Sequence, residues 1–509
     1  PTLRSIPLSA PLLSSVGFAT ELRQAVYDHV QKLSYTELDT LGTDTLITRL
    51  TDDINQVQNG VNMGLRLLLR SPFIVLGSMV MAFTINTRCA LIFAVAIPVL
   101  FLVVFVIMYL SIPLFGKVQG RLDTVTGLTR ENLTGVRVIR AFGQEPAEIG
   151  KFDGENDALK KIQTTAGRIS ALMNPLTYVM INLAIVVILN TGAVQIHAGT
   201  MQQGDVIALV NYMNQILIEL VKLANLIIQV TKAMACFNRI QDVFHIEPSM
   251  KEGTKTVAAA GDTTPAVEFK NVSFTYAGGG DHAVENISFK AMPGQTIGII
   301  GGTGSGKSTL VNLIPRFYDV SEGEVDIAGK NVQDYTYGSL RNTISVVPQK
   351  AQLFAGTIRD NLTFGCPDAT EEQIEEALAI SQAKEFVDTK EGRLDAKIEQ
   401  GGKNLSGGQR QRLTLARALV PQSDILIMDD SASALDYATD ARLRKAIQDM
   451  KRKPTVFIVS QRTSSIQNAD MILVLDDGKI AGQGTHEQLL KSCNIYREIY
   501  ETQFKKEEA

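Results

Sequence analysis

The sequence predicts an α-helical transmembrane bundle with long helical extensions, followed by an α/β domain. Two features of its 509 residues lead to this fold class. Long runs without charge are concentrated in the first half, as in CALIFAVAIPVLFLVVFVIMYLSIPLFG at 89–116. After residue 265 the chain changes to short β-rich runs that alternate with helix-like segments.

Composition narrows the possible classes of protein. The chain carries 49 Lys and Arg against 53 Asp and Glu, a net charge of −4, so a large basic surface that binds nucleic acid is not expected. Mean hydropathy is +0.08 although 20% of residues are charged, so the apolar residues must be concentrated in part of the chain. The four cysteines, Cys89, Cys236, Cys366 and Cys493, lie too far apart for a zinc cluster or a CxxC pair. The reducing cytosol is the expected compartment of the soluble part.

Four stretches are long and apolar enough to cross a bilayer, which takes roughly 20 apolar residues in a helix. They lie at about 61–87, 89–116, 169–198 and 204–230. The alternative, four buried helices of a large soluble core, fits their lengths and lack of charge less well. Residues 18–245 are therefore expected to form a transmembrane domain in contact with the lipid bilayer.

Charged, helix-like stretches lie beside these spans, at 20–60 and 117–168. Both are too long for turns, so the spanning helices are expected to continue beyond the membrane as helical extensions. The loops at the other ends are short, around 86–88 and 197–204. Because the long basic-rich side is the cytoplasmic one by the positive-inside tendency, the extensions should be cytoplasmic.

A second domain follows a linker. Residues 246–265 lose helical periodicity and gain Gly, Pro, Thr and Ala, which indicates the linker. Residues 266–504 contain the β-rich runs and are expected to form a parallel-sheet α/β domain, and 505–509 are a tail. The strands expected are 296–300, 425–428, 455–460 and 471–475.

A glycine-rich segment between a strand and a helix has the spacing of a phosphate-binding loop. Residues 301–308 read GGTGSGKS, which fits GxxxxGK[ST]. Main-chain N–H groups of such a loop surround phosphates, and the helix N-terminus adds a favourable dipole. Lys307 is expected to reach the β- and γ-phosphates of a nucleotide, and Ser308 to bind Mg²⁺; a purely structural glycine turn is the alternative. The phosphate-site residues are Gly301, Gly302, Thr303, Gly304, Ser305, Gly306, Lys307, Ser308 and Thr309.

The segment ILIMDD at 425–430 is an apolar strand that ends in two carboxylates. Asp429 is expected to hold Mg²⁺ through its water shell, as in a Walker B motif. An ordinary strand end would be an equally good interpretation of this segment alone. The phosphate-binding loop elsewhere in the domain favours the metal role.

A third motif precedes the helix-like segment RQRLTLARALV. Its residues are Leu405, Ser406, Gly407, Gly408 and Gln409. With this motif the chain resembles the ABC ATPase family, whose signature is LSGGQ. The resemblance implies ATP and Mg²⁺ as cofactors, Tyr276 stacked on adenine, and Gln349 sensing Mg²⁺ and coupling to the membrane part. It also implies that Asp436, in SALD, lies at the contact between two ATPase domains.

The first half of the chain extends the resemblance. The order of the spans, the helical extensions, the linker and the C-terminal ATPase domain resembles that of an ABC exporter half-transporter over about residues 18–504. Two short coupling helices are implied near 35–41 and 136–144. The family has six spans, and four are predicted here. Residues 1–17 are too short and Pro-rich to span, and Pro1 is no initiator, so we expect an irregular remnant after loss of the first span and most of the second.

Two positions depart from the family's catalytic pattern. The family carries Glu as catalytic base after the Walker B Asp, whereas Asp430 here is one methylene shorter. A misplacement of about 1 Å can cost on the order of 100-fold in rate. The switch His of the family is replaced by Gln461, which can bond a phosphate oxygen but carries no charge. Together they predict a site that binds ATP and hydrolyses it poorly; a slower but complete ATPase is the alternative.

The resemblance implies a subunit of an ATP-driven exporter of a drug, lipid or other small amphipathic compound. It implies a plasma or inner membrane location with a cytoplasmic ATPase domain. ABC domains pair head to tail, so each ATP lies between one chain's P-loop and the other chain's signature. An intact signature beside an altered base predicts a heterodimer with a second ABC half-transporter that carries Glu and His, as in heterodimeric bacterial multidrug exporters. Hydrolysis is then expected mainly at the partner's site.

Three other functions compete with this one. A soluble ABC ATPase of the repair or translation type is opposed by the four apolar runs. A regulatory subunit or channel-like ABC protein would bind ATP without transport-coupled hydrolysis. An importer normally has its spans and ATPase in separate chains, so the presence of both in this chain argues against an importer.

Polar residues recur at spacings of three and four in the last span. They are Asn211, Asn214, Gln215, Glu219 and Lys222. Polar groups inside a membrane face a cavity or another helix. The first four are therefore candidates for the transport pathway, and the alternative is bonding between helices, with Glu219 and Lys222 paired.

Overall fold

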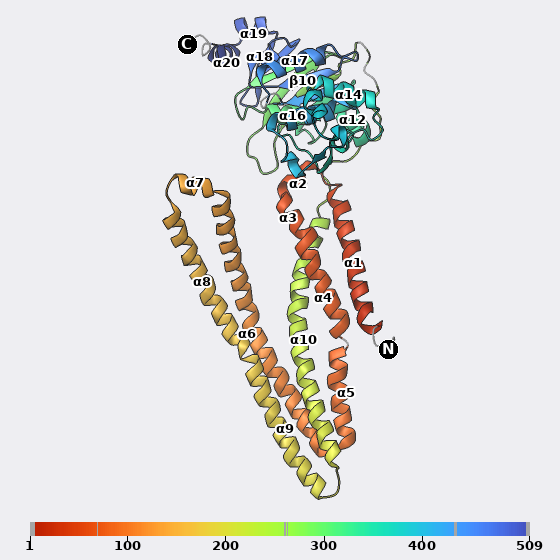
Figure 1. The fold of residues 1–509 in the computed structure, drawn as a ribbon, viewed down its shortest axis with the longest axis vertical. Helices are drawn as coiled ribbons and strands as arrows, with labels where there is room; N and C mark the ends of the chain where they lie inside the picture. Colours follow the sequence, from red (N-terminus) through yellow and green to blue (C-terminus); the bar gives the residue numbers. More distant parts are fainter. Residues whose placement is uncertain (1–5, 69, 259–260, 262, 432–434, 505–509) are drawn as a thin grey trace. The chain divides into compact units, whose positions relative to one another are not determined.

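The computed structural model describes residues 6–68, 70–258, 261, 263–431 and 435–504 (Figure 1). It contains two compact units. The first combines the chain up to Gln31 with Thr43–Ile246, and the second combines Lys32–Gly42 with the chain from Glu247 onward. The expected tail 505–509 and the first five residues of the expected irregular remnant lie outside the described residues.

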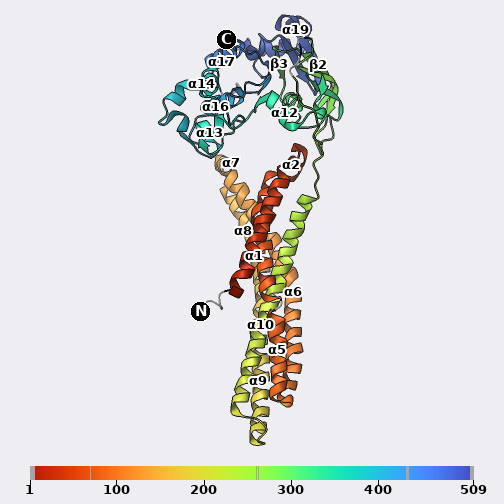
Figure 2. The same cartoon turned by 90° about the vertical axis from the view of Figure 1, so that its right-hand side faces the viewer.

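The first unit consists of long helices. They are α1 (Ile6–Val30), α3 (Thr43–Thr48), the π-helix η1 (Arg49–Asp53), α4 (Ile54–Leu67), α5 (Arg70–Ile85), α6 (Thr87–Thr134), α7 (Val136–Ala141), α8 (Glu145–Ala171), α9 (Met173–His197) and α10 (Gln203–Phe244). Figures 1 and 2 show α7 at the tip of a hairpin formed by α6 and α8. Residues 6–17, expected to be irregular, belong to α1; Pro7 lies in its first turn, where a missing N–H breaks no helical bond.

Close backbone approach holds α10 against its neighbours. Gly60 of α4 faces Ala233 of α10 so closely that an added Cβ would lie 2.2 Å from the Ala233 Cβ. Gly192 of α9 faces Val206 of α10 in the same way, at 2.7 Å. Small residues at helix contacts are typical of membrane bundles, because they allow the dispersion contacts that replace a hydrophobic driving force.

Three helical stretches of the described chain have the length and composition of membrane spans: Thr43–Ile85, Thr87–Thr134 and Glu145–His197. The sequence predicts a fourth at 204–230, within α10, which is not among these three. Helix α10 nevertheless packs along α5, α6 and α9. The fourth span therefore stays a prediction.

In the second unit, helices surround two main sheets. The strands are β1 (Val267–Phe274), β2 (Val284–Ala291), β3 (Thr296–Gly301), β4 (Glu322–Ile327), β5 (Lys330–Asn331), β6 (Ile344–Val347), β7 (Gly356–Thr357), β8 (Lys397–Ile398), β9 (Ile425–Asp429), β10 (Thr455–Val459), β11 (Met471–Asp476) and β12 (Lys479–Gly484). The helices are α2 (Tyr35–Leu41), α11 (Lys307–Leu313), α12 (Tyr337–Thr343), α13 (Ile358–Leu362), α14 (Glu371–Ile380), α15 (Lys384–Asp388), α16 (Gly407–Leu419), α17 (Tyr437–Gln448), α18 (Thr463–Ile466), α19 (His486–Ser492) and α20 (Asn494–Phe504), with 3₁₀ turns η2 (Val332–Asp334), η3 (Arg393–Asp395) and η4 (Gln400–Gly402).

Strand order explains where a ligand site can form. The six-stranded sheet has the order β12-β11-β3-β10-β9-β6, and every neighbouring pair except β11–β12 is parallel. The four-stranded sheet β2-β1-β4-β5 is antiparallel. Predicted strands 296–300, 425–428, 455–460 and 471–475 correspond to β3, β9, β10 and β11. In parallel sheets the carboxyl ends of strands meet at one edge, which is where α/β proteins bind ligands.

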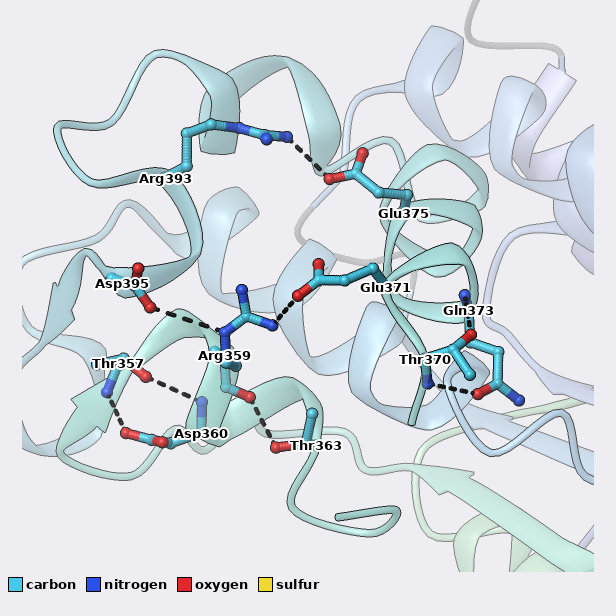
Figure 3. Close-up of polar contacts among 10 residues, drawn as sticks. All are labelled: Thr357, Arg359, Asp360, Thr363, Thr370, Glu371, Gln373, Glu375, Arg393 and Asp395. Atoms are coloured by element: carbon cyan, nitrogen blue, oxygen red, sulfur yellow. Dashed lines mark hydrogen bonds and ion pairs between the residues drawn. The ribbon is translucent and has the colours of Figure 1, made fainter. Parts of the chain in front are cut away.

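A small helical region of the second unit is held by ion pairs (Figure 3). Arg359 of α13 pairs with Glu371 of α14 and lies 3.7 Å from Asp395 of η3. Arg393 pairs with Glu375 of α14 at 2.8 Å. Exposed pairs of this kind contribute little individually, but together they tie η3 to α13 and α14.

A buried carboxylate joins η1 to α10 in the first unit. The Arg239 guanidinium donates two hydrogen bonds to Asp53, one of them from Nε at 3.0 Å, and Arg49 Nη1 donates a third at 2.9 Å. Asp53 is buried, and an unpaired buried carboxylate is costly, so these three hydrogen bonds supply the partners that it needs.

Replacing Asp53 by Asn removes the charge that both arginines bind. We expect a loss of about 1–3 kcal/mol of stability at neutral pH, seen as a lower thermal midpoint of the detergent-solubilised chain. Asp52→Asn is the matched control, because Asp52 is the exposed neighbour. Equal midpoints for the two variants at pH 7 would contradict a stabilising role for the Asp53 cluster.

Candidate nucleotide-binding site

The expected phosphate loop lies at the carboxyl edge of the six-stranded sheet. Register places Ile299 of β3 beside Val459 of β10, and Val459 beside Asp429 of β9. A cavity of about 360 Å³ opens at this edge. It is lined by Tyr276, Ala283, Thr303, Gly304, Gly306, Lys307, Ser308, Thr309, Gln349, Asp429, Asp430, Val459, Ser460 and Gln461.

Glycine is required at two points of the loop. An added Cβ at Gly301 would lie 2.1 Å from the Leu475 carbonyl oxygen. Gly306 has φ +89°, and a Cβ there would lie 2.4 Å from the Ala283 carbonyl oxygen. Gly302 and Gly304 instead face open space, so their backbone can approach a ligand directly. The loop therefore fits tightly against the sheet and leaves its main chain accessible.

Lys307 at the start of α11 is folded back onto the loop. Its Nζ donates to the carbonyl oxygen of Gly301 at 3.0 Å and to that of Gly302. Burial lowers the pKa of Lys307, and the carboxylates of Asp429 and Asp430 partly oppose this. A triphosphate supplies the anionic acceptors that favour a buried ammonium group, so the residue fits a nucleotide.

Two oxygen ligands suited to Mg²⁺ lie next to each other. Ser308 Oγ donates to Asp429 Oδ1 at 3.0 Å. Burial raises the pKa of Asp429, and the nearby Asp430 adds to the rise, while Ser308 and Lys307 oppose it. Among the described residues no group of three or more His, Cys, Asp or Glu side chains could hold a metal ion. Mg²⁺ is usually held by one or two protein oxygens together with substrate phosphates and waters, and Ser308 and Asp429 supply such oxygens.

Tyr276 offers an aromatic surface at the cavity. Its hydroxyl lies 3.1 Å from Thr309 Oγ1 of α11. Its ring makes edge contacts with Phe274 and Tyr318, at centroid distances of 4.9 Å and 5.3 Å. The residue is 36% exposed, which leaves ring surface for a base. The position implied by the family resemblance therefore fits an adenine platform.

The two substituted positions both line the same cavity. Asp430 follows β9 with a left-handed backbone, φ +45°, and its N–H donates to the Val459 carbonyl at 3.0 Å. Gln461 follows β10, and its carbonyl accepts from Gln503 Nε2 at 2.6 Å. Gln349 also lines the cavity. The structure thus brings together the expected Gln349, Asp429, Asp430 and Gln461.

The signature residues lie elsewhere in the second unit. Ser406 caps α16 by accepting from the Gln409 N–H at 3.3 Å, and Gln409 Oε1 accepts from the Ser406 N–H at 3.0 Å. None of the residues 405–409 lines the cavity. Asp436 caps α17 through Thr439, whose N–H and hydroxyl lower the pKa of Asp436. Residues 432–434 of the same loop are outside the described chain.

Three lining residues were not expected from the sequence. Ala283, Val459 and Ser460 carry no ionisable side chain, and their place in the cavity depends on strand order. The expected pathway residues Asn211, Asn214 and Gln215 are exposed on α10. Glu219 is buried: it accepts from Ser71 Oγ of α5 at 2.7 Å and from Lys222 Nζ at 2.9 Å. The alternative of bonding between helices accounts for Glu219 better than an open pathway does.

Lys307→Ala removes the charged donor of the loop. We expect nucleotide affinity to fall about 10- to 100-fold, since a hydrogen bond to a charged group is worth about 1.5–3 kcal/mol. Titration of the full chain with a fluorescent ATP analogue measures this. Lys330→Ala, on an exposed strand end of the same domain, is the control and should leave affinity unchanged. Equal ATP-analogue affinities of the Lys307→Ala variant and the unmodified chain would show that Lys307 does not contribute to nucleotide binding.

Comparison with known proteins identifies the same two parts. Residues 12–220 match the family model of the ABC transporter transmembrane region, and residues 284–433 match the family model described as ABC transporter. An uncharacterized ABC transporter ATP-binding protein of Mycobacterium tuberculosis is 37% identical over 493 residues, 96% of this chain and 84% of that protein. The ATP-dependent lipid A-core flippase of Escherichia coli is 30% identical over 484 residues, 95% of this chain and 83% of the flippase.

A solved structure shows the same fold. The ATP-bound structure of a bacterial Atm1-family ABC exporter superposes with a TM-score of 0.80 at 22% identity, covering 96% of this chain and 86% of that one. Matched in both halves and along nearly its whole length, this chain belongs to the ABC transporter family as an exporter half-transporter, with a membrane-spanning domain and a cytoplasmic ATPase domain.

Proposed function

We propose that this chain is the weakly hydrolysing subunit of a heterodimeric exporter that moves a drug, lipid or other amphipathic compound. The observation that carries the proposal is the composition of the cavity. Its loop, lysine, Asp429 and aromatic platform are suited to binding MgATP, whereas Asp430 and Gln461 occupy the places of the family's catalytic Glu and His.

Asp430 is the more consequential of the two substitutions. Its carboxylate is one methylene shorter than Glu on a backbone fixed by the bond to Val459. A general base must come within hydrogen-bond reach of the attacking water, so a retracted carboxylate slows proton transfer. Gln461 offers a neutral amide where imidazolium charge would stabilise the transferring phosphate.

The partner is inferred from the separation of the signature and the cavity. One chain supplies the phosphate loop for its own ATP, and its signature, Leu405–Gln409, lies outside that cavity. In the proposed head-to-tail dimer this intact signature completes the partner's site, where a Glu and a His carry out most of the hydrolysis. Asp436 is proposed to lie at the same contact.

Transport is proposed to follow from ATP-driven closure of the two ATPase domains. The expected coupling helices correspond to α2 (Tyr35–Leu41) and α7 (Val136–Ala141). Val138 and Phe142 at the α7 turn are exposed apolar side chains, which suits docking on the ATPase domain of the partner. Movement of these turns would convert an inward-facing cavity to an outward-facing one.

Exposed Asn211, Asn214 and Gln215 on α10 are proposed to line the pathway, giving polar contacts for the head of an amphipathic substrate. The relationship to a lipid A-core flippase supports a lipid-like compound among the candidates. A regulatory, channel-like ABC protein is the second candidate, and the same two substitutions, Asp430 and Gln461, favour it. ATP-dependent uptake into inverted vesicles distinguishes the exporter from a channel, which would show passive ion conductance.

Restoring the family's catalytic pair tests the weak site. We expect Asp430→Glu with Gln461→His to raise the ATPase rate of the purified chain about 10- to 100-fold, because a base displaced by about 1 Å costs rates of that order. Adding Lys307→Ala to the double variant is the control and should abolish the gain. An unmodified chain that alone turns over at about 1–10 s⁻¹ would contradict both the weak site and the required partner.

A further inference from the structure

Helix α2 packs within the ATPase unit although more than 200 residues separate it from that unit's other elements in the sequence. Its N-terminal turn contacts the linker: the Ser249 N–H donates to Glu37 Oε1 at 3.3 Å. Its outer face contacts the segment after α11, where the Tyr35 ring lies 4.8 Å from that of Phe317 and 5.9 Å from that of Tyr318. The Tyr318 hydroxyl donates to Asp39 Oδ2 at 2.7 Å.

Tyr318 also contacts the base platform of the nucleotide site. Its ring meets that of Tyr276 edge-on, with centroids 5.3 Å apart and planes at 83°. Phe274 lies 5.4 Å from Tyr318 and 4.9 Å from Tyr276, so the three rings form one cluster. A single side chain thus touches the aromatic ring that faces the cavity and the helix that leads into the membrane domain.

The segment that carries Tyr318 is held firmly. Arg316, only 2% exposed, donates from Nε to Asp319 Oδ1 at 2.7 Å and from Nη2 to the Lys251 carbonyl at 2.9 Å. The Phe317 N–H donates to the Asn312 carbonyl at 3.1 Å, which ties the segment to the end of α11. When a bound base displaces the Tyr276 ring, the Tyr318 ring beside it cannot move independently of its own segment. The displacement therefore passes through Tyr318 to α2.

We propose that Tyr318 is a positioning residue that makes α2 respond to stacking of the nucleobase on Tyr276. The proposal rests on the proposed function, because it requires Tyr276 to bind the base of ATP. The phosphate loop meets the aromatic cluster at Thr309, whose Oγ1 lies 3.1 Å from the Tyr276 hydroxyl, whereas a stacked base would contact the Tyr276 ring itself. A bound base would contact Tyr276, and Tyr318 would pass its effect to Tyr35 and Asp39.

The bond to Asp39 persists across the physiological pH range. Burial, and next the hydrogen bond to Asp39, raise the pKa of Tyr318 far above its usual value. The phenol is thus always a donor to the carboxylate, and a charged acceptor makes the bond stronger than a neutral one.

Hydrogen exchange of the backbone amides in Lys32–Gly42 tests the proposal in the full chain in lipid nanodiscs. The ligands are a non-hydrolysable ATP analogue with Mg²⁺, and Mg²⁺-tripolyphosphate, which has phosphates and no base. At saturation, we expect the analogue to slow exchange about fivefold or more, the range of ordinary coupling energies, and tripolyphosphate to slow it less than about twofold.

Substitutions at Tyr318 and Asp39 distinguish the contribution of the Tyr318 ring from that of its hydroxyl group. Tyr318→Leu should reduce the protection given by the analogue to the tripolyphosphate level, and Tyr318→Phe and Asp39→Ala should each lower it partly. The double variant Tyr318→Phe/Asp39→Ala should equal either single variant, because each single substitution already removes the same hydrogen bond. Tyr337→Phe is the control: Tyr337 stacks on Arg316 and lies outside the aromatic cluster, so protection should be unchanged.

Full analogue protection in Tyr318→Leu, or equal protection by tripolyphosphate and analogue in the unmodified chain, overturns the proposal. Additive effects of Tyr318→Phe and Asp39→Ala overturn the role of their bond. Failure of the proposed function looks different: the unmodified chain then either binds no ATP analogue or, alone, turns over ATP at about 1–10 s⁻¹. A chain that binds the analogue and transports in an ATP-dependent way, with α2 protection independent of the base, refutes only the role of Tyr318.

Discussion

Parallel pairing of β3, β10 and β9 is the constraint on which the rest of the site depends. It aligns Ile299, Val459 and Asp429 across three strands, so the loop after β3 and the carboxylates after β9 reach the same cavity. A strand shifted by one residue turns its side chains to the opposite face, which would remove Asp429 from Ser308. The register of these apolar strands therefore matters to the site as much as their burial does.

Lys307 and Asp429 in the cavity differ from Asp53 in the first unit in the hydrogen-bond partners that they have within the chain. Burial disfavours the charged forms of both Lys307 and Asp429, and their nearest partners are carbonyls and a hydroxyl. Asp53 instead is satisfied within the chain by two arginines. Buried charge without a full set of partners is costly, and phosphates with Mg²⁺ would add opposite charge beside both Lys307 and Asp429. The nucleotide site is therefore built for a ligand, and the Asp53 cluster for stability.

The order of elements along the chain differs from their grouping in space. Helix α2 lies between α1 and α3 in sequence, yet its contacts with Phe317 and Tyr318 place it in the ATPase unit. A segment that leaves the membrane domain, bonds to the ATPase unit and returns connects the two through covalent chain on both sides.

The sequence by itself determined the class of fold and most of the nucleotide site, because these rest on local signals. Charge-free runs give spans, and a glycine-rich turn between a strand and a helix gives the phosphate loop wherever the rest of the chain lies. The carboxylate pair after β9 and the signature that caps α16 are equally local. Tertiary structure alone decided that Glu219 bonds to Ser71, that Ala283 and Ser460 line the cavity, and that Tyr318 joins Tyr276 to Asp39. Those contacts join residues far apart in the chain, and no periodicity or spacing records which of many possible neighbours packing will select.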